Sequence, residues 1–167
     1  MKPIVIAYQD HEVTKELFLD LIDKQNSSPY VEENTQSISS TDWRTDVGQA
    51  REYWTIFTLH VWNDIDNLLK NHIGFNEYLI ENYWYQRYET NDHHDWHWHH
   101  KAAYSGVYYL ELPEGAPGTQ IELPVTREIL NPAVSEGDII VFPSIYRHRS
   151  APNQGKNRKT IIAFNVS

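Results

Sequence analysis

Cysteine is absent from this chain of 167 residues. Its absence excludes a disulfide framework, a thiolate-bound zinc or iron–sulfur centre and a thiol nucleophile. A bound metal ion would therefore need His, Asp or Glu side chains as its ligands. The length, together with an apolar content of 40%, suits a chain that buries one core, so we expect a single domain over residues 1–167.

Long apolar runs and clustered basic residues are also missing. The apolar run in the N-terminal segment MKPIVIAYQD is too short for the core of a signal peptide, and no later run approaches the roughly 18 apolar residues of a membrane-spanning helix. These features predict a soluble, cytoplasmic protein without a membrane segment. The 14 Lys and Arg residues are scattered and outnumbered by 23 Asp and Glu, giving a net charge of −9, which disfavours nucleic acid as a partner.

Helical patterns occupy the first half of the chain. Apolar residues at helical spacing predict a helix over residues 11–25, and the capped segment 63–84 predicts a second one, either continuous or broken near Gly74. The polar, aperiodic segment 26–50 predicts a long surface loop that either covers a binding site as a lid or is disordered. Residues 51–59 are β-branched and aromatic enough to predict a strand. We therefore expect residues 1–83 to form a largely helical N-terminal part.

Short apolar or alternating runs, separated by turn residues, fill the chain from residue 84 to residue 167. Strands at this spacing are typical of a sandwich or a barrel. The sequence therefore predicts an α+β fold class with a mainly β core at 84–167, and with the N-terminal helices packed on one sheet of that core.

Histidine is concentrated in one short segment, since five of the nine histidines lie within residues 93–100. On a strand, a period of two would place Asp95, His97 and His99 on one face, where two imidazoles can share a metal ion. His148, which follows an apolar strand and a turn, is the best candidate for a third ligand. The alternative interpretation is a histidine-rich surface tract that binds metal ions adventitiously.

Arg158 and Thr160 form a second candidate group close to the C-terminus. On a strand their side chains would share a face, where a guanidinium fork and a hydroxyl can bind a carboxylate. This pair predicts a site for the far carboxylate of a diacid. A solvated arginine at the end of a turn is the alternative.

Four ordered motifs resemble those of the Fe(II)/2-oxoglutarate-dependent dioxygenases over roughly residues 84–166. The motifs are HWH at 97–99, SGVYYL at 105–110, EGDIIVFP at 136–143 with a histidine at 148, and RKT at 158–160. The first two are similar to a family of small bacterial and phage oxygenases with an HxH…SGvYYl pattern. The last is similar to the co-substrate motif RxS/T of the superfamily.

The resemblance implies a double-stranded β-helix, the jelly-roll fold shared with cupins, and a mononuclear Fe(II) centre. The implied metal ligands and catalytic residues are His97, His99 and His148, with Asp95 as the alternative third ligand. The implied co-substrate is 2-oxoglutarate, whose far carboxylate would be held by Arg158, Thr160 and Tyr109. An enzyme of this kind consumes O2, releases succinate and CO2, and usually hydroxylates its substrate.

His99 departs from the superfamily pattern, which usually has Asp or Glu at this position. A neutral third ligand leaves more positive charge on the iron, which favours an anionic co-substrate and slows oxidation of Fe(II). The alternatives are a cupin-type 3-His metal dioxygenase and a non-catalytic metal-binding module. Gly137 and Pro143 match a cupin spacing, but the Glu that cupins place after HxH is replaced here by Ala103 or Tyr104.

The resemblance leaves the substrate open, because loops and helices outside the motif-bearing strands select it in this superfamily. A small molecule and a peptide both remain candidates. A homodimer is the commonest assembly of soluble proteins and is the one we expect if the chain associates with itself.

Overall fold

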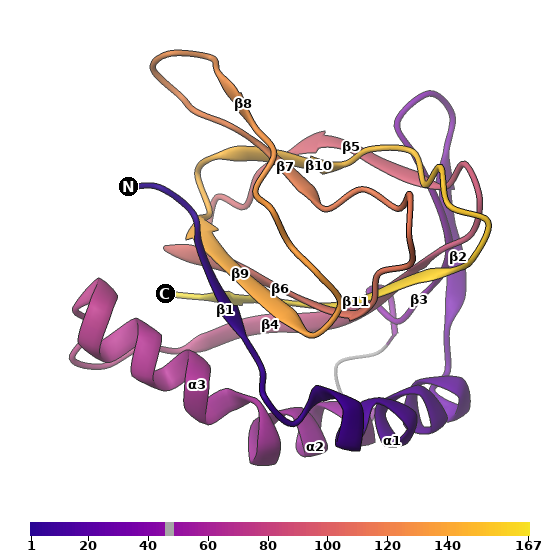
Figure 1. Cartoon of the computed structure of the whole chain (residues 1–167), viewed down its shortest axis with the longest axis horizontal. Helices are drawn as coiled ribbons and strands as arrows, with labels where there is room; N and C mark the ends of the chain where they lie inside the picture. The colour runs from indigo at the N-terminus through magenta and orange to yellow at the C-terminus, as the bar shows by residue number, and fades with distance from the viewer. Residues whose placement is uncertain (46–48) are drawn as a thin grey trace.

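The computed structural model of the protein describes residues 1–45 and 49–167. In this part of the chain, eleven strands form one curled antiparallel sheet in the order β1-β9-β6-β11-β4-β3-β5-β10-β7-β8, with β2 paired to β3 (Figure 1). The strands are β1 (Ile4–Ala7), β2 (Ser28–Glu32), β3 (Gln36–Thr41), β4 (Ile80–Tyr88), β5 (His93–His97), β6 (Tyr104–Glu111), β7 (Thr119–Glu122), β8 (Ile129–Leu130), β9 (Asp138–Pro143), β10 (Arg147–Ser150) and β11 (Lys159–Val166). The helices are α1 (His11–Lys24), α2 (Glu52–His60), α3 (Trp62–Asn67) and the π-helix η1 (Leu68–Ile73).

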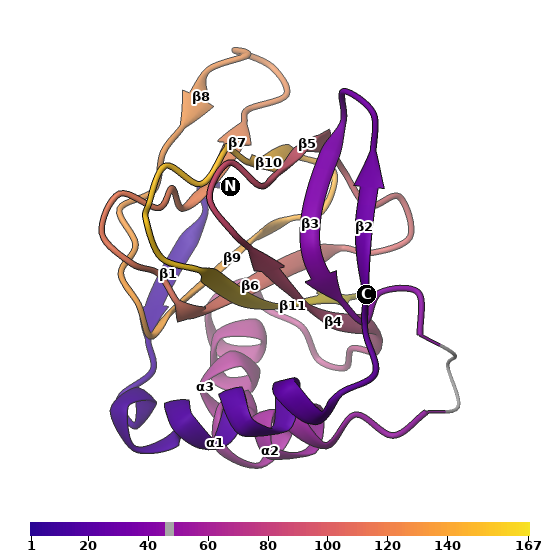
Figure 2. The same ribbon diagram turned by 90° about the vertical axis from the view of Figure 1, so that its right-hand side faces the viewer.

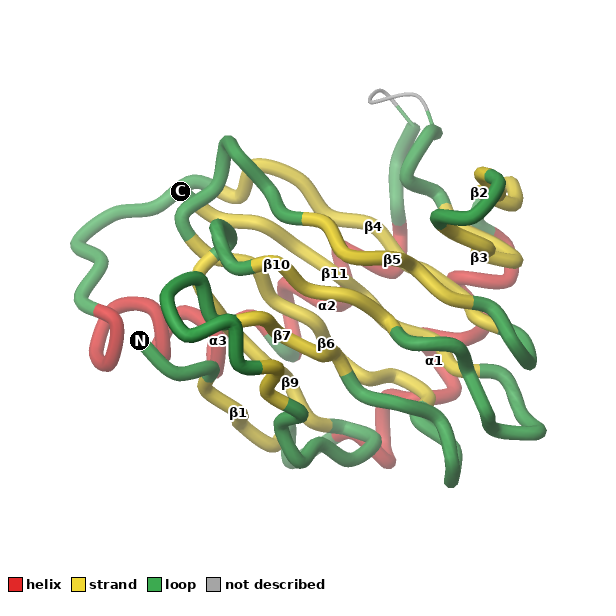
Figure 3. The backbone as a smooth tube through the Cα atoms, turned by 90° about the horizontal axis from the view of Figure 1, so that it is seen from above, coloured by secondary structure: helices red, strands yellow, loops and turns green. Residues whose placement is uncertain are grey.

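The curled sheet has two walls that face each other. Strands β1, β9, β6, β11 and β4 form the helix-covered wall, because the helices pack against its outer side (Figures 1 and 2). Strands β5, β10, β7 and β8 form the opposite wall, which lies over the first when seen from above (Figure 3). Strand β3 joins the walls, since it pairs with both β4 and β5. The predicted mainly β fold with helices on one sheet is confirmed.

Strand β11 shows how sequence and burial agree in the helix-covered wall. All eight of its residues are buried, because helices cover one face and the interior between the walls covers the other. Ile162 and Phe164 belong to the cluster that contains Phe18 and Phe57 of the helices, whereas Ile161 belongs to the interior cluster. The sequence of a strand that is covered on both faces is a continuous apolar run rather than an alternation of apolar and polar residues.

The prediction of a long loop over residues 26–50 is wrong, because this segment contains the β2–β3 hairpin. Its polar residues fit a hairpin whose second strand completes the sheet. The buried carboxylate of Asp92 accepts hydrogen bonds from the Ser37 and Ser39 hydroxyls and from the Ser39 amide. Residues 46–48 of the predicted lid lie outside the described residues.

The strand predicted for residues 51–59 is also wrong, since Glu52–His60 form α2. Tyr53, Trp54 and Phe57 are buried on one side of this helix, where they pack against the sheet. Burial of one helical face outweighs the weak β preference of aromatic residues.

The predicted second helix stops at the break expected near Gly74 and does not resume before β4. The π-helix η1 ends at Ile73, and Gly74 follows it with φ 94°, a left-handed conformation that favours glycine. The chain then enters β4 at Ile80. No helix among the described residues has the length and apolar character needed to cross a membrane.

Candidate metal centre

Strands β5 and β10 bring three of the predicted site residues together. His97 and His148 are direct partners across the two strands, and His99 follows β5 by two residues. Each of these histidines offers a ring nitrogen, and the three nitrogens lie within 4.8 Å of one another. An ion bound at about 2.1 Å holds its nitrogen ligands roughly 3 Å apart. Small rotations of the rings would therefore let all three bind one ion.

Hydrogen bonds fix which ring nitrogen two of these histidines present. The Nδ1 of His97 lies 2.7 Å from the backbone carbonyl oxygen of Asp95. The Nδ1 of His148 lies 3.0 Å from the backbone carbonyl oxygen of Tyr146. A carbonyl oxygen only accepts, so each Nδ1 carries the proton and each Nε2 keeps its lone pair. Metal-binding histidines are commonly oriented by such a bond from the other ring nitrogen.

Burial keeps the cluster neutral. It lowers the pKa of His148 well below the ordinary value, with the neighbouring His97 adding to the effect. Burial likewise lowers the pKa of His97, and it lowers that of His99 to about 4. Neutral imidazoles are the form that binds a metal ion, so these rings need not lose a proton at neutral pH.

Asp95 does not join the cluster, which corrects its place as the alternative ligand. Its side chain instead accepts a hydrogen bond from the Trp96 amide at 2.7 Å. The pairing of β5 with β10 shifts between His97 and His94, which marks a bulge in β5. A bulge adds one residue to a strand and breaks the period of two, so Asp95 and His97 no longer share a face.

The same bulge brings in His94, which the sequence interpretation did not place at the site. The rings of His94 and His97 are stacked, with centroids 3.8 Å apart. The Nδ1 of His94 lies 3.5 Å from the amide nitrogen of Gln86, and burial lowers the pKa of His94 to about 2. Strict alternation places residue 94 on the face opposite residue 97, and no sequence pattern here signals the bulge.

A narrow cavity extends from the histidines into the interior between the walls. Its lining includes Gln86, Tyr88, Thr119 and Ile161, all from strands that face the interior. The volume is about 30 Å³, close to the space one water molecule occupies in the liquid. Any larger ligand would therefore require inward side chains to move. The Tyr109 hydroxyl donates a hydrogen bond of 2.9 Å to the hydroxyl of Thr119, a residue that lines this cavity.

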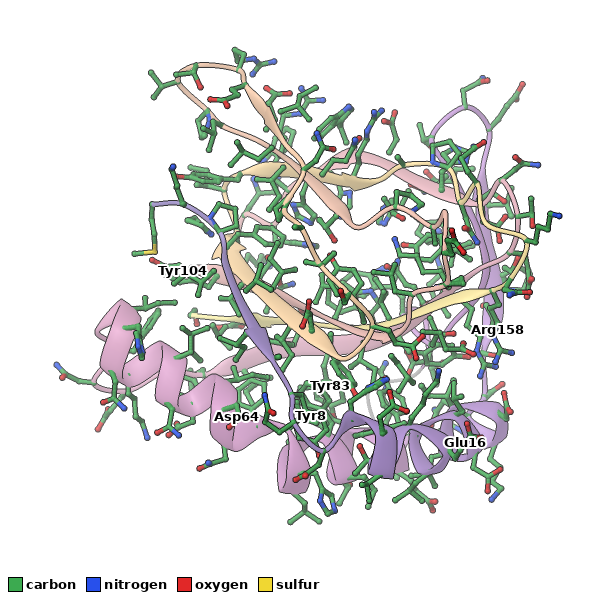
Figure 4. The ribbon with its side chains drawn as sticks, viewed as in Figure 1. Tyr8, Glu16, Asp64, Tyr83, Tyr104 and Arg158 are labelled. Atoms are coloured by element: carbon green, nitrogen blue, oxygen red, sulfur yellow. The ribbon has the colours of Figure 1, made fainter. Side chains whose placement is uncertain are left out.

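Arg158 and Thr160 lie elsewhere, which corrects their assignment as the carboxylate clamp. The Nε and Nη2 atoms of Arg158 donate to the two carboxylate oxygens of Glu111 at 2.9 and 3.1 Å, and the Thr160 hydroxyl donates to the same carboxylate. Neither residue lines the narrow cavity, and neither does the intervening Lys159. Figure 4 shows Arg158 at the outer edge of the sheet, on the side of α1.

Lys159 takes the inward position on β11. It pairs with Tyr88 across β4, and its Nζ donates to the Ser150 hydroxyl at 2.9 Å and to the Pro117 carbonyl oxygen at 2.7 Å. The side chain is 1% exposed, and no ion pair to a carboxylate is found for it in the described part of the chain. Burial lowers the pKa of this ammonium group to about 7. Lys159 is therefore a buried cation without an anionic partner.

Comparisons with known proteins identify the fold. No protein-family model matches the chain, and no curated protein sequence matches it. Solved structures do match, among them an oxidoreductase of the 2OG-Fe(II) oxygenase family from Burkholderia pseudomallei, with 16% identity and a TM-score of 0.79 over 99% of this chain and 85% of that one. A prolyl-4-hydroxylase from Pseudomonas putida matches with 14% identity and a TM-score of 0.69 over 98% of this chain and 91% of that one.

A third match is SnoN, an alpha-ketoglutarate-dependent non-heme epimerase from nogalamycin biosynthesis. It has 11% identity and a TM-score of 0.75, over 99% of this chain and 77% of that one. Matches of this extent confirm the predicted jelly-roll, double-stranded β-helix fold. The protein therefore has the fold of solved 2OG-Fe(II) oxygenases, with a three-histidine cluster and a buried lysine in its interior.

Proposed function

We propose that this protein is an Fe(II)- and 2-oxoglutarate-dependent oxygenase whose metal ligands are His97, His99 and His148. One observation carries the proposal: the neutral histidine cluster and the unpaired ammonium group of Lys159 lie within the interior of the same double-stranded β-helix. A 2-oxo diacid has one end that chelates a metal ion and a second carboxylate that needs a cation. The interior offers a partner for each end.

The histidine cluster fits Fe(II) by its donor set. Imidazole suits iron, as it suits zinc, copper and nickel, and three ligands on one side of an ion leave other positions open. When bound together, Fe(II) and 2-oxoglutarate supply the oxidising chemistry, in which O2 oxidises 2-oxoglutarate to succinate and CO2 and also oxidises a substrate. The chain supplies the ligands, the electrostatic environment and the exclusion of water.

Lys159 fits the far carboxylate of the diacid. Its ammonium group is held by Ser150 and Pro117, both neutral, so an incoming carboxylate would supply the missing negative charge. A charge-assisted hydrogen bond of this kind is strong in a buried site. Ser150, which accepts a hydrogen bond from the Lys159 ammonium group, lies two residues from His148 on β10. This contact supports the proposal that Lys159 and the histidine cluster bind the two ends of one diacid.

The neutral ligand set affects the charge balance. Because the three ligands are uncharged imidazoles, a divalent ion there keeps its full charge of two, which a dianionic co-substrate can neutralise. The lining of the narrow cavity beside the histidines includes the apolar side chains of Val107, Phe142 and Ile161, which would limit access of water to the reacting end of the co-substrate.

Turnover of the co-substrate tests the proposal. The purified protein, supplied with Fe(II), 2-oxoglutarate and O2, is expected to form succinate slowly even without a substrate, as measured by proton NMR. Omission of Fe(II) or exclusion of O2 serves as the control and is expected to stop succinate formation. Stoichiometric binding of iron and 2-oxoglutarate with no succinate under any condition would contradict the proposal and favour a metal-binding module.

A further inference from the structure

A second cavity opens beside the histidine cluster, and we call it the aromatic cavity. It has a volume of about 160 Å³. Its lining residues are Tyr30, Trp43, Trp84, Gln86, His94, His97 and His99. Two of these, His97 and His99, are proposed metal ligands, so a group bound in the aromatic cavity would lie next to the metal ion.

Trp43 is an exposed aromatic residue on a rigid support. Its side chain is 40% exposed, yet the preceding residue, Asp42, is fully buried. The Asp42 carboxylate accepts hydrogen bonds from the Tyr53 hydroxyl at 2.7 Å and the Tyr85 amide at 2.9 Å, and it pairs with Arg51 at 3.1 Å. These contacts fix the backbone at Trp43. An exposed aromatic residue held rigidly beside a reactive centre is typical of a binding site.

Trp84 links Trp43 to the metal ligands. The rings of Trp43 and Trp84 meet edge to face with centroids 4.4 Å apart, and the Trp84 ring meets the His99 ring with centroids 5.7 Å apart. Trp84 comes from β4 and is buried, so it is part of the helix-covered wall. A continuous aromatic surface therefore runs from solvent at Trp43 to the metal ligand His99.

The lining of the aromatic cavity contains no Asp, Glu, Lys or Arg. Its residues are histidines, aromatic residues and one amide, Gln86. The nearby guanidinium group of Arg44 lies over the Tyr30 ring at 4.0 Å and pairs with Glu32 at 3.5 Å. One face of the Tyr30 ring is therefore covered by the Arg44 guanidinium group, whose positive charge is balanced by the Glu32 carboxylate.

We propose that the aromatic cavity is the substrate subsite and that it takes an uncharged, ring-sized apolar group. The inference rests on the proposed oxygenase function, because the cavity becomes a substrate site only if its histidines hold the reactive metal. A cavity of about 150 Å³ is large enough for benzene, so 160 Å³ suits one six-membered ring. A cationic group is disfavoured, because it would lose hydration and face a divalent ion held by neutral ligands.

Two small fluorinated probes test the chemistry of the aromatic cavity. The probes are 4-fluorobenzyl alcohol and 4-fluorobenzylamine, which share a ring and differ in charge at neutral pH. Fluorine NMR measures their dissociation constants on the metal-free protein and on protein loaded with Zn(II), which does not turn over. We expect the alcohol to bind both forms, and the protonated amine to bind the Zn(II) form at least fivefold more weakly than the alcohol.

The variant Trp43→Ala is expected to weaken binding of the alcohol at least fivefold, because it removes the outer half of the aromatic surface. The matched control is Trp98→Ala. Trp98 is 43% exposed and lies between His97 and His99 in the sequence, but it does not line the aromatic cavity. This control is expected to leave the dissociation constant unchanged.

Two results would overturn the proposal. One is unchanged alcohol binding in Trp43→Ala, and the other is equal or tighter binding of the protonated amine, which would indicate a cation site. The probe assay needs neither iron nor 2-oxoglutarate, so its failure is distinguishable from failure of the oxygenase. A third outcome is that the parent protein forms no succinate but still binds the alcohol in a way that depends on Trp43. That result would overturn both the oxygenase function and the role of the cavity as a substrate subsite, and the cavity would then be a ring-binding site only.

Discussion

Replacing Lys159 with Met is expected to weaken 2-oxoglutarate binding roughly 30-fold or more, since loss of one partner of a buried charge pair costs about 2 kcal/mol or more. The same variant is expected to unfold at an equal or higher temperature than the parent. In the ligand-free protein Lys159 is 1% exposed and has no anionic partner among the described residues, so an apolar side chain of similar length removes the cost of burying its charge. Calorimetric titration of the Zn(II)-loaded protein and thermal unfolding measure the two effects.

Arg158→Ala is the matched control for Lys159→Met. The two residues are adjacent, but Arg158 lies on the other side of the sheet, paired with Glu111. We expect this variant to bind 2-oxoglutarate like the parent. A loss of affinity in Arg158→Ala with none in Lys159→Met would restore Arg158 as the clamp and contradict the assignment drawn from the structure.

The pKa of Lys159 adds a pH dependence to the same prediction. Burial lowers this pKa to about 7, whereas the phenol of Tyr88, whose ring faces the ammonium group, stays neutral because burial raises the pKa of Tyr88. Only the protonated amine binds the carboxylate, so affinity for 2-oxoglutarate is expected to fall on the order of tenfold between pH 7 and pH 8.5. In the unfolded chain the lysine pKa is about 10.4. The ligand-free parent should therefore gain stability as the pH rises from 7 towards 10, and Lys159→Met should lack this gain.

Replacing His148 with Ala is expected to weaken Fe(II) binding by a factor of about 100 or more. Loss of a residue that only orients a ligand costs roughly 10- to 100-fold in metal affinity, and loss of a ligand itself should cost at least as much. Of the three proposed ligands, His148 alone comes from β10, whereas His97 ends β5 and His99 follows it, so the variant leaves two proposed ligands from a single segment. Anaerobic competition with a coloured chelator measures the affinity, and thermal unfolding verifies that the variant is folded.

His100→Ala is the control for the histidine-rich tract. His100 is exposed, and its ring accepts a hydrogen bond from the Trp98 indole at 2.8 Å, outside the cluster. This variant is expected to bind Fe(II) with unchanged affinity. Equal losses in both variants would indicate adventitious binding along the tract rather than a defined centre.

The sequence predicted the β half of the fold better than the helical half. Strands β9 and β11 are apolar runs bounded by Gly, Pro and Asn, and their buried positions are those expected for strands covered on both sides. The β2–β3 hairpin was missed because its strands are polar and are stabilised by contacts with distant residues such as Asp92. Helix α2 was missed because its aromatic side chains are selected by tertiary packing rather than by local preference.

The spacing of the histidines predicted which of them lie together in the structure. His97 and His99 were identified from the HxH pattern, and His148 from the strand that precedes it. The structure brings these three histidines together. Asp95 was misplaced because a bulge shifts the face of β5. The proposed clamp, Lys159, differs from the predicted Arg158 by a single residue, and a shift of one position on a strand moves a side chain to the opposite face.

Anaerobic titration of the metal-free protein with Fe(II) and then with 2-oxoglutarate tests whether the histidine cluster binds iron that the 2-oxo acid can chelate. We expect a weak visible charge-transfer band that appears only after 2-oxoglutarate is added, with one equivalent of each bound per chain. We expect no band in His148→Ala at the same concentrations. Stoichiometric iron binding without a band at any concentration of 2-oxoglutarate would contradict the proposed oxygenase function.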